Sequence, residues 1–161
     1  MNTKVSSIPA GYHTATPYLI VRDAARAIEF YKQAFGAAEV MRMADPGGRV
    51  MHAEIKIGDS HVMLADECPE MGFRSPATLG GTPIILMLYV PNVDALTQQA
   101  IAAGAQVLRP VQDQFYGDRS GTVTDPFGHC WTLSTHIEDV APEEMKRRAA
   151  AFMKDCGESK S

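Results

Sequence analysis

Residues 14–36 read TATPYLIVRDAARAIEFYKQAFG, and this stretch predicts a strand that runs directly into a helix. The first part, 14–23, is rich in strand-forming residues and ends in a charged pair. The second part, 24–36, carries apolar residues at helical spacing, namely Ala24, Ile28, Tyr31 and Phe35. Gly36 stands where the C-cap of such a helix is expected.

Three further strands are expected after this helix. They are predicted at 39–43, 49–57 and 60–65, separated by an Asp-Pro-Gly-Gly turn and a Gly-Asp turn. One strand, one helix and three strands make a βαβββ unit. Residues 12–70 are therefore expected to form a first module.

The same order of elements repeats in the second half of the chain. A helix is predicted at 93–103, and strands are predicted at 83–90, 106–108, 122–124 and 130–135. Val90 follows Val21 by 69 residues, and Gly104 follows Gly36 by 68 residues. This near-constant offset indicates an internal duplication, with a second module over 82–140.

Two segments lie outside the modules. Residues 71–82 are rich in Gly, Pro and Thr and are expected to form a linker. A last helix is predicted at 143–156, with an apolar stripe made of Met145, Ala149, Phe152 and Cys156. We expect a single α+β domain over 12–140, in which two βαβββ modules form a cupped mixed sheet. An amphipathic C-terminal helix and tail would follow over 141–161.

Composition limits the class of protein. The chain has 161 residues, of which 45% are hydrophobic and 21% charged, and this is typical of one globular domain. The formal net charge of −4 argues against a nucleic-acid partner or an anionic membrane surface. No apolar run approaches the length of about 18 residues that a membrane span needs. The three cysteines are widely spaced and fit no disulfide framework. We expect a cytoplasmic protein.

Strand alternation indicates which side chains share a face. In 49–57 an apolar set alternates with a polar one: Met51, Ala53, Ile55 and Ile57 against His52, Glu54 and Lys56. A sheet that is covered by helices on one face only shows this pattern. The polar face would then line a concavity or simply face solvent, and the pattern alone leaves both alternatives open.

Several motifs resemble those of the glyoxalase/bleomycin resistance/dioxygenase, or vicinal oxygen chelate, superfamily. In chain order they are PYLIVRDAARAIEFY (17–31), MHAEI (51–55), MLAD (63–66), YGDRSG (116–121) and DPFGHCW (125–131). The resemblance covers about 12–140 and is greatest to the PhnB-like branch.

The resemblance implies two βαβββ modules that pair within one chain or across a homodimer. In enzymatic members it also implies a divalent metal that acts as a Lewis acid. The four ligand positions of glyoxalase-type members fall on Thr16, Glu54, Ile85 and Thr132. Only Glu54 offers a good donor, because threonine hydroxyls bind such ions poorly and isoleucine has no donor. No cofactor is therefore expected, and His52 and Glu54 are weak candidates should a divalent metal bind.

Further residues are expected in a ligand cavity. The predicted ligand-binding set is Thr16, Tyr18, His52, Ile85, Met87, Tyr89, Arg119 and Thr132, with Glu54 as the candidate catalytic residue. Arg119 would hold a ligand carboxylate or phosphate, or instead pair with a nearby acid such as Asp118. Six positions are predicted to converge on one pocket: Thr16, Glu54, Ile85, Met87, Tyr89 and Thr132.

The favoured function is the binding of a small molecule without the full glyoxalase metal site, as in resistance or sequestration. The alternative is a metal-dependent lyase, isomerase or dioxygenase of the same superfamily with an atypical ligand set. No glycine-rich nucleotide-binding motif and no nucleophile elbow occur in the sequence. The expected partners are a small-molecule ligand and a second copy of the chain, with no nucleic acid and no membrane.

Overall fold

The computed structural model describes the backbone of residues 5–158 and the side chains of residues 5–154. The first module contains β1 (Tyr18–Val21), α1 (Ala24–Phe35), β2 (Ala38–Ala44), β3 (Val50–Ile57) and β4 (Ser60–Asp66). The second module contains β5 (Ile85–Tyr89), α3 (Val93–Ala103), β6 (Gln106–Asp113), β7 (Asp118–Thr124) and β8 (Cys130–His136). Between the modules lie the short helices η1 (Pro69–Met71) and α2 (Pro76–Leu79). The helix α4 (Pro142–Glu158) follows the second module.

Each module forms its own four-stranded sheet. The strand orders are β1-β4-β3-β2 and β5-β8-β7-β6. In both sheets the first strand pairs parallel to the last, and the remaining pairs are antiparallel. The predicted α+β fold of two βαβββ modules with a C-terminal helix is confirmed. The strands β6 and β7 are longer than predicted, and the motif at 116–121 lies in their hairpin and in β7.

The ends of α1 show why the opening stretch folds as predicted. Asp23 adopts a left-handed conformation at the N-cap, and its side chain accepts a hydrogen bond from the Arg26 amide. Gly36 adopts a left-handed conformation with φ 66° at the C-cap, where its amide donates to Lys32. Local sequence therefore sets both ends of this helix.

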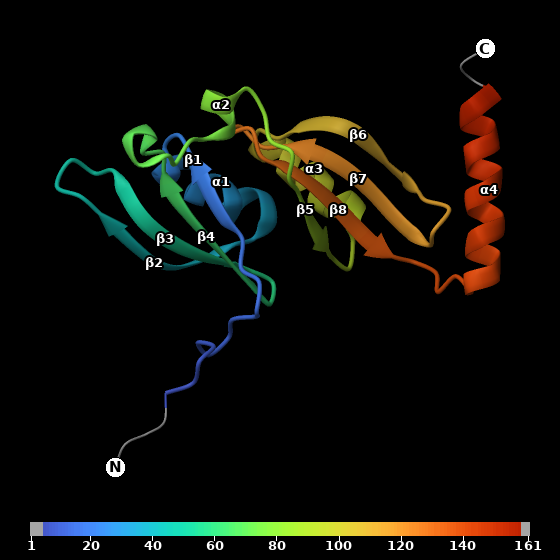
Figure 1. Cartoon of the computed structure of the whole chain (residues 1–161), viewed down its shortest axis with the longest axis horizontal. Helices are drawn as coiled ribbons and strands as arrows, with labels where there is room; N and C mark the ends of the chain where they lie inside the picture. Colours follow the sequence, from blue (N-terminus) through green and yellow to red (C-terminus); the bar gives the residue numbers. More distant parts are fainter. Residues whose placement is uncertain (1–4, 159–161) are drawn as a thin grey trace.

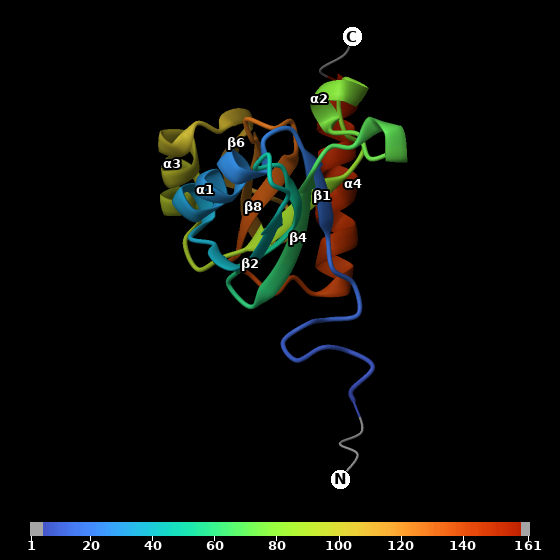
Figure 2. The same ribbon diagram turned by 90° about the vertical axis from the view of Figure 1, so that its left-hand side faces the viewer.

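The two helices of the modules pack side by side on one side of the sheets. Figure 2 shows α1 and α3 on one side and α4 on the other. Each sheet therefore has a face covered by helix and an open face, and Figure 1 looks onto the open faces. No helix in the described part of the chain is long and apolar enough to cross a lipid bilayer.

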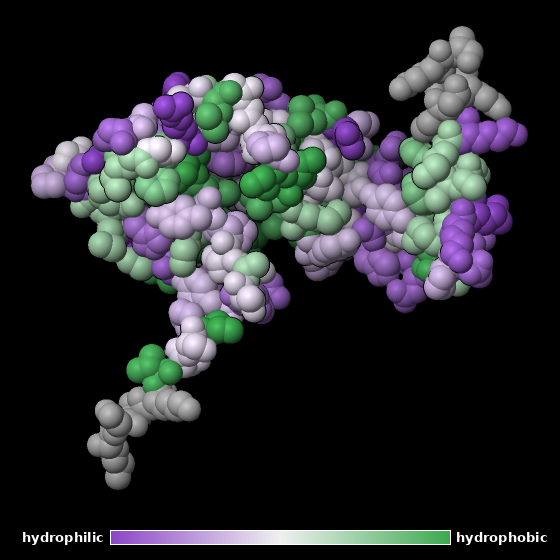
Figure 3. Space-filling model, in the orientation of Figure 1, coloured by the Kyte–Doolittle hydropathy of each residue, from purple (hydrophilic) through white to green (hydrophobic). Residues whose placement is uncertain are grey.

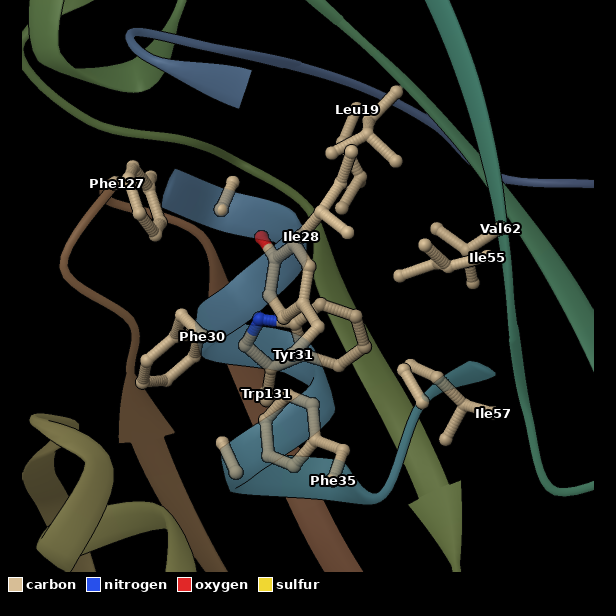
Figure 4. Close-up of a cluster of buried hydrophobic side chains, with 14 of the residues drawn as sticks. Leu19, Ile28, Phe30, Tyr31, Phe35, Ile55, Ile57, Val62, Phe127 and Trp131 are labelled. Carbon is tan, nitrogen blue, oxygen red and sulfur yellow. The ribbon is translucent and has the colours of Figure 1, made fainter. Parts of the chain in front are cut away.

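A single core joins the two modules. Side chains from α1 meet Trp131 of β8 and Phe127 of the preceding turn (Figure 4). The Asp125 carboxylate accepts hydrogen bonds from the Tyr31 hydroxyl (2.7 Å) and the Trp131 indole N–H (2.9 Å). The amide of Gln99 on α3 also donates to the carbonyl oxygen of Gln33 on α1 (2.8 Å). The modules are thus tied together by both apolar and polar contacts.

Side chains along the described part of α4 hold the helix against the second module. The Arg148 guanidinium forms a bidentate ion pair with Glu138, at 2.8 Å for each hydrogen bond. The Phe115 and Phe152 rings are in contact, with centroids 5.1 Å apart. Along the predicted stripe, Met145 and Ala149 are partly buried and Phe152 is exposed. The side chain of Cys156 lies outside the described residues.

Candidate functional site

A polar network lies on the open face of the first sheet. The side chains of His52 and Glu54 project from β3 on this face, and His52 Nε2 lies 3.2 Å from Glu54 Oε1. The Tyr18 hydroxyl lies 2.9 Å from His52 Nδ1, and the Tyr12 hydroxyl donates to Glu54. The side chains of His52 and Glu54 are only 24% and 15% exposed. Sequence parity correctly places His52 and Glu54 together on the face without helices.

Tyr12 is the member of this network that the sequence does not reveal. It lies in the segment before β1, 42 residues from Glu54, and its ring stacks on His61 with centroids 4.0 Å apart. No periodic pattern covers that segment, so only the folded chain brings Tyr12 onto the sheet. Desolvation by burial raises the pKa of the Tyr18 hydroxyl above its usual range.

An apolar hollow adjoins the network. Its volume is about 250 Å³, and Tyr18 belongs to both the hollow and the network. Most of its other walls are apolar, including Ile20, Met51 and Phe73, and the charged residues Arg49 and Asp66 also line it. The hollow thus sets apolar walls next to fixed hydrogen-bonding groups, which is the usual composition of a small-molecule site.

The prediction for Met51 is wrong. Alternation places it on the helix-covered face, but the structure leaves it 48% exposed in the hollow and buries Val50 instead. The register between β2 and β3 shifts here, because Met43 pairs with His52 whereas Ala44 pairs with Val50. A β-bulge of this kind re-aims the side chains beyond it.

Methionines dominate the rest of this open face. Met41 and Met43 on β2 pair in register with Glu54 and His52, and Met63 pairs with Tyr18. The alternation in 38–44 is the signal that could have located the first two. Flexible, polarisable methionine side chains adapt to ligands of different shape.

The open face of the second sheet carries four of the other predicted residues. Ile85, Met87 and Tyr89 alternate along β5 and are exposed, and Thr132 pairs with Met87 in register. The Thr132 hydroxyl lies 3.1 Å from the Thr122 hydroxyl. These side chains come together on one face, as their parity predicts.

The six positions expected in one pocket are divided between several places in one chain. Glu54 lies on the first sheet, whereas Thr132 lines a cavity on the second. Thr16 lines a third cavity, between the sheets, together with Met87. The positions are divided because each module forms its own hydrogen-bonded sheet.

Arg119 lies apart from these groups. Its guanidinium donates two hydrogen bonds to Asp94 of α3 (2.7 and 2.8 Å) and one to Asp113 (2.8 Å). Along β7 it alternates with Ser120, which lines the open face, so it projects on the side of α3. Two alternatives were predicted for Arg119, a ligand anion or an intramolecular ion pair. The structure has the ion pair, and its acids are Asp94 and Asp113 instead of Asp118.

A second polar network surrounds Asp118 at the end of the second sheet. Its carboxylate accepts hydrogen bonds from Tyr89 (2.9 Å), Ser134 (3.2 Å) and His136 (2.8 Å). Burial alone would raise the pKa of Asp118, but these hydrogen bonds outweigh it and lower the pKa. Hydrogen bonds to Asp118 and Asp139 raise the pKa of His136. The network thus favours a carboxylate beside an imidazolium ion.

We expect the stability of the chain to depend on this imidazolium. The pKa of His136 lies above 6.5 in the folded chain. Its contribution to stability is therefore complete at a pH below the pKa of the unfolded chain. That contribution is lost as the pH rises through the pKa of the folded chain. His136→Gln should therefore lower the urea midpoint more at pH 6 than at pH 9. His13→Gln is the control, because no hydrogen bond or ion pair involving His13 occurs in the described part of the chain. An equal loss at both pH values would contradict the expectation.

The donors on the open faces do not fit the metal that the fold implies. Among the residues that the structure describes, no group of three or more His, Cys, Asp or Glu side chains could hold an ion. His52 and Glu54 have two tyrosine hydroxyls as their neighbours, and Thr132 has Thr122. A catalytic zinc site needs three protein ligands of the His, Cys, Asp or Glu type.

Comparison with known proteins identifies the family of the chain. The model of the Glyoxalase/Bleomycin resistance protein/Dioxygenase superfamily matches residues 12–133. The chain is 46% identical over 134 residues to the uncharacterized protein Rv0887c of Mycobacterium tuberculosis, covering 81% of this chain and 79% of that protein.

Two solved structures illustrate the shared fold. TioX from Micromonospora sp. ML1 is 25% identical, with a TM-score of 0.61, and the match covers 80% of this chain and 100% of that one. A PhnB protein from Bacillus cereus is 18% identical, with a TM-score of 0.60, and the match covers 76% and 99%. The resemblance found in the motifs is confirmed. The chain belongs to the glyoxalase/bleomycin resistance protein/dioxygenase superfamily.

Proposed function

We propose that this protein binds a small, largely apolar molecule in the hollow of the first sheet and sequesters it without turnover. One observation carries the proposal. Tyr18 forms a wall of the 250 Å³ hollow and also belongs to the hydrogen-bonded network of His52, Glu54 and Tyr12. A ligand in the hollow therefore meets apolar walls and fixed polar groups at once.

The walls define the chemistry of the ligand. Ile20, Met51 and Phe73 would bury an apolar body, which contributes about 25 cal/mol for each Å² of apolar surface removed from water. The carboxyl oxygens of Glu54 favour a ligand with a hydroxyl or an N–H group near Tyr18. The methionines beside the hollow would let it accept related ligands of different shape.

The donor set supports binding over metal-dependent turnover. Glu54 is engaged by Tyr12 and by His52, and it has no second carboxylate or second histidine beside it among the described residues. Held in this way, the carboxylate is an oriented hydrogen-bond acceptor. We therefore propose that Glu54 orients a ligand beside the hollow.

A neutral fluorescent probe, N-phenyl-1-naphthylamine, tests the hollow directly. We expect saturable binding to the purified protein, with about one probe per chain, and a loss of affinity of about tenfold or more in Met51→Lys, since a charge in an apolar pocket is poorly solvated. Met153→Lys is the matched control, because Met153 is also exposed but lies on α4 outside the hollow. Equal affinities of the two variants would rule the hollow out.

Native mass spectrometry and metal analysis of the same preparation test the alternative. We expect a bound organic molecule that is released on unfolding and is reduced in Glu54→Gln. One equivalent of divalent metal per chain, lost in Glu54→Gln, would contradict sequestration. It would favour a metal-dependent lyase, isomerase or dioxygenase instead.

We further propose that the protein is a homodimer in which the open faces are covered by a second copy. Large apolar side chains remain exposed on both faces, namely Tyr18, Met41, Met43, Met51, Ile85, Met87 and Tyr89. Figure 3 shows hydrophobic side chains gathered in the middle of this side of the molecule. Both sheets have the same strand order, so the first sheet of one copy can meet the second sheet of the other twice about a twofold axis.

The dimer predicts a mass near twice 17.5 kDa in sedimentation equilibrium at micromolar concentration. Ile85→Glu should shift the population toward single chains, because it places a charge in the middle of the buried face. Leu79→Glu should not, since Leu79 is similarly exposed but lies on α2, outside both open faces. A wild-type mass of one chain would refute the dimer and leave the probe experiment unaffected.

A further inference from the structure

Arg109 is an exception among the arginines of this chain. In the described part of the chain, every other arginine except Arg74 has an ion pair with a carboxylate. Arg109 lies on the edge strand β6, and Arg74 lies in the linker between the modules. Of these two arginines, Arg109 lines a well-formed cavity.

That cavity lies on the open face of the second sheet and has a volume of about 330 Å³. Hydroxyl groups form its floor, from Ser120 and Thr122 on β7 and Thr132 on β8. No aspartate or glutamate of the described chain lines it. Among the described residues, the cavity of Arg109 is thus lined by neutral hydrogen-bonding and apolar groups, and no ion pair of Arg109 with a carboxylate occurs there.

Apolar side chains complete the walls. Met87 contributes from β5, and Phe152 contributes from α4, which stands on the open side of the sheets (Figure 2). Phe152 is 52% exposed although its ring is in contact with Phe115. The cavity therefore offers an apolar contact opposite its polar floor.

The backbone of β6 directs the Arg109 side chain toward this floor. Register shifts flank Arg109 on both sides, so that Arg109 pairs with Thr122 and Gln112 pairs with Ser120. The extra residue directs Arg109 and Gln112 to the same face. The bulge also needs Gly121, since a Cβ there would lie 2.9 Å from the Val111 side chain and 3.1 Å from the Arg109 carbonyl oxygen.

We propose that this cavity binds the carboxylate or phosphate-type oxyanion of a small organic molecule. The Arg109 guanidinium would donate two hydrogen bonds to the oxyanion, and the hydroxyls of Thr122 and Ser120 would supply further donors. The organic part of the ligand would lie between Met87 and Phe152. The site shares no lining residue with the hollow of the first sheet, so either can fail without the other.

Isothermal titration of the full chain with phenylphosphonate and with benzoate tests the site. We expect both to bind, and the tighter one identifies the anion that the site prefers. Arg109→Gln should weaken binding by about tenfold or more, because charge-assisted hydrogen bonds are roughly twice as strong as neutral ones. Arg74→Gln, which removes the other unpaired arginine and the same charge, should change affinity less than about twofold.

Inorganic phosphate and Phe152→Ala separate the two parts of the site. Phe152→Ala should weaken both aromatic ligands and leave the affinity for phosphate unchanged. Circular dichroism and the urea midpoint establish that each variant is folded, which is expected because Arg109 and Phe152 are exposed. Absence of binding, equal losses in Arg109→Gln and Arg74→Gln, or no loss in Arg109→Gln would each overturn the proposal.

Discussion

Asp125→Ala is expected to lower the free energy of unfolding by about 3–5 kcal/mol, because each buried donor left unsatisfied costs about 1–3 kcal/mol and relaxation recovers part of the sum. The Asp125 carboxylate accepts hydrogen bonds from Tyr31, from Trp131 and from the backbone amides of Phe127 and His129. The residue is 4% exposed, so water cannot replace these bonds. Alanine would leave all four donors unsatisfied in the core.

Urea unfolding monitored by Trp131 fluorescence measures this effect. Asp59→Ala is the control, since Asp59 is an exposed aspartate whose side chain hydrogen-bonds locally, to its neighbour Ser60. The lost hydrogen bonds also join the two modules, because Tyr31 lies on α1 of the first module and Trp131 on β8 of the second. A loss below about 1 kcal/mol would mean that the network adds little to the stability of the core.

Gly117→Ala is expected to destabilise the fold by about 3 kcal/mol or more, because it combines two costs. The backbone has φ 95°, where a Cβ is strained, and a Cβ would also overlap the Glu138 carbonyl oxygen. The Gly117 carbonyl accepts hydrogen bonds from the amides of Ile137 and Glu138 (2.9 and 3.0 Å). Displacing it would also disturb the Glu138–Arg148 ion pair that fixes α4.

Gly48→Ala separates the two costs. Gly48 has φ 88°, but a Cβ there would meet nothing within 4 Å, so its substitution carries conformational strain alone, about 1–2 kcal/mol. The difference between the two variants in urea unfolding therefore measures the contact with Glu138. Equal losses would show that the loop relaxes and that this contact does not fix the start of α4.

Some features of the site follow from the chain by local rules. Alternation along 49–57 puts His52 and Glu54 on one face, since strand side chains alternate whatever surrounds them. Alternation along β5 groups Ile85, Met87 and Tyr89 in the same way. The same rule fails at Met51, because a β-bulge depends on how β2 pairs with β3. The pairing register of two strands cannot be predicted from the sequence of one of them.

The internal duplication, the helix with its Asp23 and Gly36 caps, and the βαβββ order were determined by the sequence alone, because period and capping act over a few residues. Only the tertiary structure decided which distant groups meet. Tyr12 reaches Glu54 across 42 residues, and Arg119 pairs with Asp94 across 25. Arg109 has no carboxylate partner in the described part of the chain for the same reason. Such encounters depend on the packing of whole elements, which residue spacing does not encode.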